Sequence, residues 1–312
     1  MAPKSKKRSK AAAEEYVDII PESMKGFGKS VMTKAALEQM VIEGILPDQE
    51  SMEWVPADGQ EVPLADRVQA VVFKSFYVRG FGIPTCDFFR GLLHYYGIEL
   101  VNLNPNSVLH IAIFIHLCEA FLGIHPHFDL FRYLFCLKSQ PSDDDPAAVG
   151  GCGLQLRKGC KTKYIYVPLP DTNKGWHREW FYCGNHKPSL PEFHGQPPKV
   201  KETWTEKPPA SSQPEIDRLL KAIDAWKMKN LTGVVVAASF SLRRVQPIKK
   251  RDHPAWMYDP KGDQTREAPE PAPVKEVENR LKSCFSSLGN FPPPQIHGGY
   301  RKSIRREPVC DL

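Results

Sequence analysis

The stretch GWHREWFYCGNH, residues 175–186, gathers two Trp, one Phe, one Tyr, two His, one Arg and one Cys within twelve residues. These side chains suit three kinds of site. Thiolate and imidazole groups bind zinc, aromatic rings stack on nucleic-acid bases, and the same rings close the core of a folded protein. Which of the three applies decides what the sequence says about function.

A zinc site in this stretch would use Cys183 and His186, with Cys152 and Cys160 as partners from an earlier strand-like run. Zinc takes four ligands in a tetrahedron, and compact pairs such as C-x-x-C favour that geometry. The chain has no C-x-x-C pair, and seven residues separate Cys152 from Cys160. We therefore predict neither a metal site nor a bound cofactor.

As a strand, the stretch would place alternate side chains on one face of a sheet: Trp176, Arg178, Trp180 and Tyr182. Such a face could stack unpaired bases, at about 1–3 kcal/mol per base. Trp176, Arg178 and Trp180 are therefore candidate nucleic-acid-binding residues. The same face would equally pack the sheet onto helices. Because Trp is usually highly buried, core packing is the favoured interpretation.

Two basic runs, at residues 6–10 and 243–251, are better candidates for contact with a partner. The first ten residues hold five of the basic side chains and no acid, so that the net charge of +6 leaves +1 for the other 302 residues. Both runs could bind nucleic acid without sequence preference, and a solvated tail or face is the competing interpretation. The first run also fits a short nuclear-import pattern, which predicts a location in the nucleus, with the cytoplasm as the alternative. The basic residues of the two runs are Lys6, Lys7, Arg8 and Lys10, and Arg243, Arg244, Lys249, Lys250 and Arg251.

No catalytic motif of an enzyme that copies, cuts or joins nucleic acid or cleaves protein is recognisable. Reverse transcriptase needs adjacent Asp residues that hold two metal ions, and the one Asp run, Asp143–Asp145, lies in a loop between predicted elements. The nearest match to the Asp-Thr/Ser-Gly motif of aspartic proteases is DTN at 171–173, which lacks the Gly. The run VRGFGIP has a Gly-x-Gly without the other residues of a phosphate-binding loop. We predict no catalytic residues.

Hydrophobic periodicity predicts helices over 33–47, 84–97, 103–123, 127–138 and 214–226. Thr33, Thr85 and Asn104 are the expected N-caps, and Gly97 and Gly123 the expected C-terminal ends. The helix over 103–123 is apolar nearly all round and should lie at the centre. Its histidine, His116, is then expected in the core and not on a metal. Alternating runs predict strands over 153–157, 163–169 and 176–182, whereas 232–245 fits either a strand or a helix.

These elements predict an α+β fold: a mainly helical bundle with a small antiparallel β-sheet and disordered termini. We expect a disordered basic arm over 1–30, one domain over 31–258 and a disordered Pro- and charge-rich tail over 259–312. Within the domain, the helical core would span 64–138, the sheet 150–186 and a helical return 214–250. Pro-rich segments at 187–199 and 206–214 are expected to be linkers. The most apolar run, 108–122, is too short and polar to span a membrane, so no membrane association is predicted.

Five segments of the chain are distinctive: FYVRGFGIP, FFRGLLHYYGIEL, NLNPNSVLHIAIFIHLCEAFLGIHPHFDLFRYLF, NKGWHREWFYCGN and RRVQPIKKRDHPAW. Together they resemble a plant family of gypsy-type transposon (transposase) domains, which is abundant in grass genomes. The resemblance covers roughly residues 30–258 and implies an origin in mobile elements. It carries no catalytic residues over to this chain.

The resemblance and the residues together predict a non-catalytic protein derived from a transposable element of the retrotransposon type. It would associate weakly and non-specifically with nucleic acid or with itself, and no small-molecule ligand is predicted. In a gag-like version, it would bind the RNA of the element through the two basic runs and self-assemble. The alternative is an inactive or divergent transposase or integrase fragment that acts on DNA with a carboxylate-bound metal. A genomic relic without a selected activity is the third hypothesis.

Overall fold

The fold was analysed from a computed structural model. It describes residues 24, 26–83, 85–141, 146–165, 167, 169, 173–187 and 189–245, without the side chains of 238 and 241–245. The tail predicted over 259–312 and nearly all of the arm predicted over 1–30 lie outside these residues.

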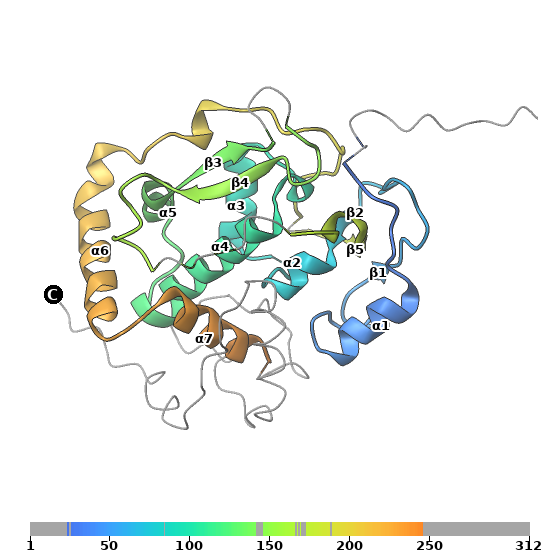
Figure 1. The fold of residues 1–312 in the computed structure, drawn as a ribbon, viewed down its shortest axis with the longest axis horizontal. Helices are drawn as coiled ribbons and strands as arrows, with labels where there is room; N and C mark the ends of the chain where they lie inside the picture. Colours follow the sequence, from blue (N-terminus) through green and yellow to red (C-terminus); the bar gives the residue numbers. More distant parts are fainter. Residues whose placement is uncertain are drawn as a thin grey trace, which may run out of the picture.

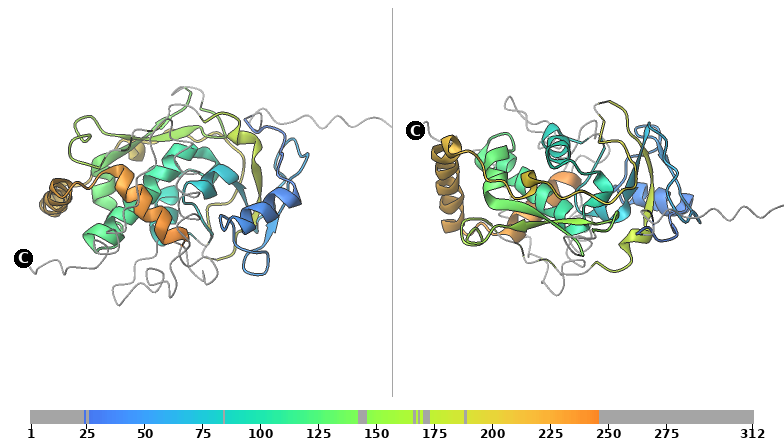
Figure 2. Two further views of the ribbon diagram at one scale, coloured as in Figure 1. Left: turned by 60° about the horizontal axis from the view of Figure 1, so that its bottom comes forward. Right: turned by 90° about the horizontal axis from the view of Figure 1, so that it is seen from above.

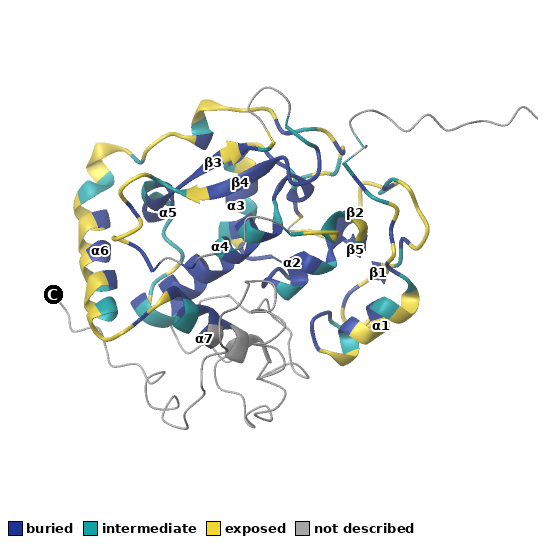
Figure 3. Ribbon diagram, in the orientation of Figure 1, coloured by how far each residue is buried: buried dark blue, intermediate teal, exposed yellow. Residues whose placement is uncertain are grey.

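The fold is built around the helix α4 (Pro105–His116), which continues into one π-helical turn, η3 (Leu117–Leu122) (Figure 1). Asn104 caps the helix as expected, because its side chain accepts a hydrogen bond from the N–H of Ser107 at 2.8 Å. Gly123, with φ 67°, ends the turn. Figure 3 shows α4 buried along its length, which confirms its predicted central place. By length and composition, 105–122 could cross a membrane, but 78% of it is buried inside the protein, as in the central helix of a folded domain.

Shorter helices surround α4. α2 (Lys74–Val78) and α7 (Gly233–Val245) pack directly on it, whereas α6 (Gln213–Met228) packs on α5 (Phe128–Leu134) and η3. The ring of Phe88 in α3 (Asp87–Tyr96) stacks on that of Phe114 in α4 at 5.6 Å. α6 stands at one edge of the molecule and α1 (Lys34–Ile42) near the other, with α7 on the side of α4 opposite the β3–β4 pair (Figure 2).

Two small antiparallel sheets complete an α+β fold. In the first, β5 (Trp180–Gly184) lies between β1 (Trp54–Val55) and β2 (Gln69–Phe73), with Tyr182 opposite Val55 and Val71. In the second, β3 (Phe135–Ser139) pairs with β4 (Cys152–Leu156), and β4 also contacts α4. Three of the five strands therefore come from outside the stretch 150–186, where the sequence placed the sheet.

Several predicted elements are corrected by the structure. The helix expected over 127–138 ends at Leu134, because Phe135 turns to an extended conformation and begins the pairing of β3 with β4. The strand expected at 163–169 is absent from its described residues, which form a turn at 163–165. The strand expected over 176–182 begins only at Trp180, since residues 176–178 form the 3₁₀ turn η4 after Gly175. Cys86, not Thr85, occupies the N-cap of α3. The ambiguous segment 232–245 contains α7.

Residues 189–212, called the strap below, run over the surface from the first sheet to α6 and include the turns η5 (Glu202–Trp204) and η6 (Ala210–Ser212). The carboxylate of Glu99 accepts hydrogen bonds from the N–H groups of His194 and Gly195 at 3.0 and 3.2 Å. Trp204 is buried and donates from Nε1 to the carbonyl of Tyr96 at 2.9 Å. The first predicted linker, 187–199, is therefore held at His194 and Gly195, and Trp204 anchors the chain between the two predicted linkers.

Candidate functional site

The aromatic stretch at residues 175–186 is buried only in Trp180–Gly184, which forms β5. Trp180 is 0% exposed, donates from Nε1 to the carbonyl of Gly28 at 2.8 Å and packs edge-on against Phe27 at 5.7 Å. Its ring therefore offers no face to a base, and the favoured interpretation of core packing is confirmed for this residue. Trp176 is half-buried and stacks on Phe76 at 5.6 Å, whereas Arg178 is exposed. For these two residues, nucleic-acid binding stays a prediction.

The four residues considered for zinc contact different partners. The thiol of Cys183 lies 3.3 Å from the hydroxyl of Tyr77, and that of Cys152 donates to the carbonyl of Asn102 at 3.2 Å. Burial raises the pKa of Cys183 to about 12 and raises that of Cys152 as well, so both stay protonated at pH 7. Cys160 donates to the carbonyl of Tyr133, and His186 is exposed beside Glu53. In the described part of the chain, no three His, Cys, Asp or Glu residues are grouped so as to hold a metal ion.

The two basic runs are hardly covered by the described residues. Arg243 and Arg244 lie in the last turn of α7, where the backbone alone is described. The other predicted contact residues lie outside the described residues: Lys6, Lys7, Arg8, Lys10, Lys249, Lys250 and Arg251. The run Asp143–Asp145 and the first two residues of DTN at 171–173 lie outside them too.

His116 was predicted to lie in the core and not to bind a metal, and it is buried in the core. Its Nε2 is 3.0 Å from the hydroxyl of Ser239 in α7, and its ring packs on that of Phe240 at 5.6 Å. These contacts join α4 to α7, so the role of the imidazole in this structure is to pack two helices together.

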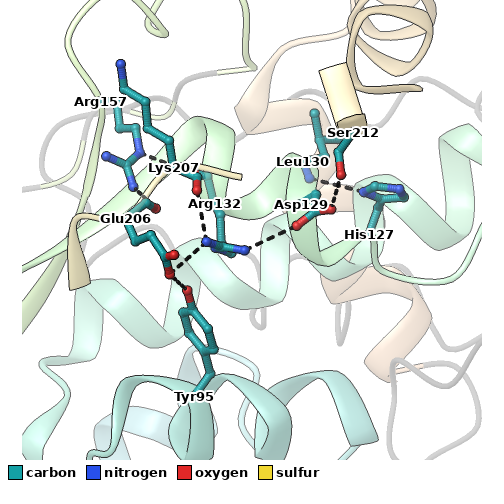
Figure 4. A network of polar contacts seen from close by, with 9 residues as sticks. All are labelled: Tyr95, His127, Asp129, Leu130, Arg132, Arg157, Glu206, Lys207 and Ser212. Carbon is teal, nitrogen blue, oxygen red and sulfur yellow. Dashed lines mark hydrogen bonds and ion pairs between the residues drawn. The ribbon is translucent and has the colours of Figure 1, made fainter. Parts of the chain in front are cut away.

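A polar network joins α3, α5 and the end of the strap (Figure 4). At its centre, the buried guanidinium of Arg132 contacts the carboxylate of Glu206 at 2.9 Å, the carboxylate of Asp129 at 3.4 Å and the carbonyl of Lys207 at 3.0 Å. The hydroxyl of Tyr95 donates to Glu206, and burial and this hydrogen bond raise the pKa of Tyr95 to about 12. Both terminal nitrogens of Arg132 have protein partners, whereas its buried Nε makes no hydrogen bond with the described residues, and the network acts as a structural anchor.

Arg157 extends the same anchor from β4. Each of its three nitrogens donates to a backbone carbonyl: Nε to that of Arg132 at 2.7 Å, and the two terminal nitrogens to those of Thr205 and Glu206 at 2.9 and 2.8 Å. The strap is therefore fixed to β4 and α5 before it enters α6. This arrangement also fixes the start of the segment 157–161, and that segment forms one wall of a pocket.

The pocket has a volume of about 560 Å³ and lies between the first turns of α4 and the outer edge of β4. Its volume is within the range of about 300–1,000 Å³ typical of small-molecule sites. The lining consists of carboxamides, one imidazole, aliphatic side chains and three cations. No Asp or Glu is among the described residues that line the pocket. The lining residues are Asn104, Asn106, His110, Gln140, Leu154, Gln155, Leu156, Arg157, Lys158, Gly159, Lys161, Val167 and Leu169.

The carboxamides in this pocket are held in place by the cap of α4. The Oδ1 of Asn104 accepts from the backbone and hydroxyl of Ser107, and its Nδ2 donates to the Oε1 of Gln140 at 2.9 Å. Gly153 of β4 permits this close approach, because a Cβ there would lie 2.8 and 2.9 Å from the two amide nitrogens. The NH₂ group of Gln140 makes no further hydrogen bond within the described residues, so it is a donor free for a ligand.

His110 lines the same pocket from the second turn of α4. Its ring packs on Phe135 at 5.6 Å, and its nitrogens make no hydrogen bond with the described residues. The surrounding protein lowers the pKa of His110 to about 4, because a charged imidazole would lose hydration there. At pH 7 the ring is therefore neutral, with one donor and one acceptor nitrogen.

The cations at the pocket belong to a basic loop, residues 157–163, with the sequence RKGCKTK. Lys158, Lys161 and Lys163 are exposed, and no acid occurs between residues 146 and 170. This loop was not among the predicted binding residues, although four basic residues in seven were a visible signal. The net charge of residues 11–312 is only +1, so it did not indicate this local excess of positive charge.

Comparison with curated proteins and with solved structures gave no match for this chain. A family model does match, over the segment that begins in β2, passes through α2, α3, α4 and α5, and ends with β3. That segment contains much of the core and part of the pocket lining, including His110. Residues 71–139 of the chain match the family described as "Putative gypsy type transposon", and they form a domain related to that family.

Proposed function

We propose that this transposon-related protein binds single-stranded nucleic acid and catalyses no reaction on it. The observation that supports the proposal is the basic loop, which presents Lys158, Lys161 and Lys163 to solvent on a rigid part of the fold. Phosphate backbones are bound chiefly by such cations, with release of condensed counterions. The proposal thus assigns to the basic loop a role that was predicted from the sequence for the two basic runs and for Trp176, Arg178 and Trp180.

The position of the basic loop also favours binding. Arg157 fixes its first residue to three backbone carbonyls, and Tyr164, which follows the loop, is buried with its ring against that of Phe135 at 5.3 Å. A loop anchored at both ends loses less conformational entropy on binding than a free tail does. The runs at 6–10 and 243–251 would add charge to the same complex, and a nuclear location and self-association are further parts of the proposal.

The test is fluorescence anisotropy of a labelled 20-nucleotide RNA, and of the same sequence as DNA, titrated with the full chain at several salt concentrations. We expect the affinity to fall linearly on a log–log plot against salt, with a slope of about −0.7 per phosphate contact. Replacing Lys158, Lys161 and Lys163 by Ala should reduce the steepness of that slope by about one unit per lost contact.

The matched control replaces three exposed lysines elsewhere, Lys34, Lys187 and Lys199, by Ala and so removes the same charge. This control should leave the slope nearly unchanged. Equal effects of the two triple variants, or no binding at low salt, would refute the proposed role of the basic loop. Cleavage or joining of the strand in the presence of Mg²⁺ would support the transposase or integrase alternative.

A further inference from the structure

The pocket beside α4 combines two chemical surfaces that a single ligand would have to match. Its inner part offers neutral hydrogen-bonding groups, the NH₂ of Gln140 and the imidazole of His110, next to the aliphatic side chain of Leu156. Its rim carries Lys158 and Lys161. A ligand that satisfies both needs an uncharged, flat, polar part and an anionic part a few bonds away.

We infer that this pocket binds one unpaired nucleotide, with the base inside the pocket and the phosphate against the lysines of the rim. The inference rests on the proposed function and names the recognition site within it. Bases present donors and acceptors along one edge and apolar faces on both sides. The pocket offers partners for each of these surfaces, on a part of the fold that the cap of α4 and the β3–β4 pair hold rigid.

The neutral groups of the pocket favour a base over a simple anion. Gln140 has an unused donor, and His110 has two ring nitrogens that make no hydrogen bond with the described residues. Both side chains are partly exposed, so a base that hydrogen-bonds to them replaces water and gains the modest net free energy of two intramolecular hydrogen bonds. An inorganic phosphate at the rim would leave both groups unused.

The rim favours an anionic ligand over a neutral one. Each of the three nitrogens of Arg157 donates one hydrogen bond to a backbone carbonyl, so the guanidinium is held in place and adds positive charge to the pocket. Lys158 forms no ion pair or hydrogen bond with the described residues, and its ammonium group is exposed. Because no described carboxylate lines the pocket, the field at the rim is positive, which suits a phosphate.

The test is isothermal titration calorimetry of the full chain with the 5′-monophosphates of adenosine, cytidine, guanosine and uridine. The uncharged nucleosides and inorganic phosphate serve as additional probes. We expect saturable binding of at least one monophosphate, with the matching nucleoside and phosphate each binding about tenfold more weakly or worse. His110→Ala and Lys158→Ala should each weaken the monophosphate about tenfold, whereas Lys34→Ala, far away on α1, should not.

A competition experiment distinguishes a free nucleotide from a residue within a strand. If the monophosphate displaces the labelled 20-nucleotide RNA, and His110→Ala weakens both ligands, the pocket reads a nucleotide of the strand. If His110→Ala weakens the monophosphate and leaves the RNA affinity unchanged, the pocket binds a free nucleotide. Either result supports the inference.

Three results would overturn it. If the RNA binds but no monophosphate does, the inference fails while the proposed function stands. Equal binding of phosphate and monophosphate would reduce the pocket to an anion site. If neither RNA nor monophosphate binds, both proposals fail. Circular dichroism shows whether His110→Ala is folded. If it is not, Lys158→Ala tests the same inference, because Lys158 is an exposed side chain.

Discussion

Arg132 shows how much one side chain contributes to this fold. Its guanidinium is 8% exposed and holds Glu206 of the strap and Asp129 of its own helix. It also lies over the ring of Tyr95 at 5.0 Å. A buried cation is tolerated when partners meet its charge and its N–H groups. Both terminal nitrogens of Arg132 have such partners, whereas the buried Nε makes no hydrogen bond with the described residues.

Replacing Arg132 by Met would keep most of the packing volume and remove the cation. Glu206 and Asp129 would lose their charged partner, and the carbonyl of Lys207 would lose a donor. We expect the free energy of unfolding to fall by about 1.5–3 kcal/mol, less than for a fully buried pair, since Glu206 is half exposed. Urea denaturation followed by circular dichroism measures this.

The matched control for Arg132 is Lys34→Met. Lys34 pairs with Glu38 at 3.7 Å, and both side chains are more than half exposed, so its loss should change stability by less than about 0.5 kcal/mol. Similar losses for the two variants would show that the network at Arg132 does not anchor the strap.

Side-chain contacts differ in how well the sequence predicts them. The caps Thr33 and Asn104 were predictable, because each bonds to a backbone group three residues away. The partners of Arg132 in the strap were not, since Glu206 and Lys207 follow it by about 75 residues and only the tertiary fold brings them together.

Among the elements, the strap differs most from its prediction. Its two Pro-rich segments were predicted to be linkers, yet Glu99 binds two N–H groups of the first, and Arg132 and Arg157 bind carbonyls at the start of the second. Trp204, between the two segments, inserts into the core beside α3. Proline removes donors and fixes backbone angles but does not prevent an extended segment from packing on a surface. The large apolar side chains within the strap, of which Trp204 is the clearest, were the signal for attachment.

Replacing Trp204 by Ala should loosen the strap. The ring is 1% exposed, so we expect a loss of about 3–5 kcal/mol in unfolding free energy. Because the turn η5 would detach from α3, limited proteolysis should cut within 189–209 before it cuts elsewhere, and mass spectrometry of the fragments locates the cuts.

Trp226→Ala is the control for this change. Trp226 is only half-buried and bonds to the carbonyl of Phe121 from α6, so its loss should cost less and should leave the strap protected. If the strap of Trp204→Ala resists protease as well as that of the unaltered protein, Trp204 is not its anchor.

The strand β3 illustrates a different limit of sequence reasoning at this scale. Residues 127–138 have a helical pattern, and the last four form a strand because β4 offers them a partner. Short apolar runs are ambiguous between the two structures, and tertiary pairing decides between them. The ambiguity of 232–245 was settled in the other direction, since α7 packs on α4.

At the scale of the whole molecule, the class of fold followed from the sequence and the candidate site did not. The apolar helix at 105–116, with its cap and its terminating glycine, predicted the centre of a mainly helical body. The pocket is built from residues about 50 positions apart on α4 and β4, so no local pattern indicated it. The net charge of the body was also misleading, because cations gathered in one loop are balanced by acids elsewhere.

The central claim is that the folded body, and not only the ends of the chain, contacts nucleic acid. The most direct test is photo-crosslinking of the full chain to a single-stranded RNA that contains 4-thiouridine, with mass spectrometry of the linked peptides. The account predicts crosslinks within the basic loop at 157–163 and in the first turns of α4, lost on competition with unlabelled RNA. Crosslinks confined to residues 1–10 and 243–251 would contradict it.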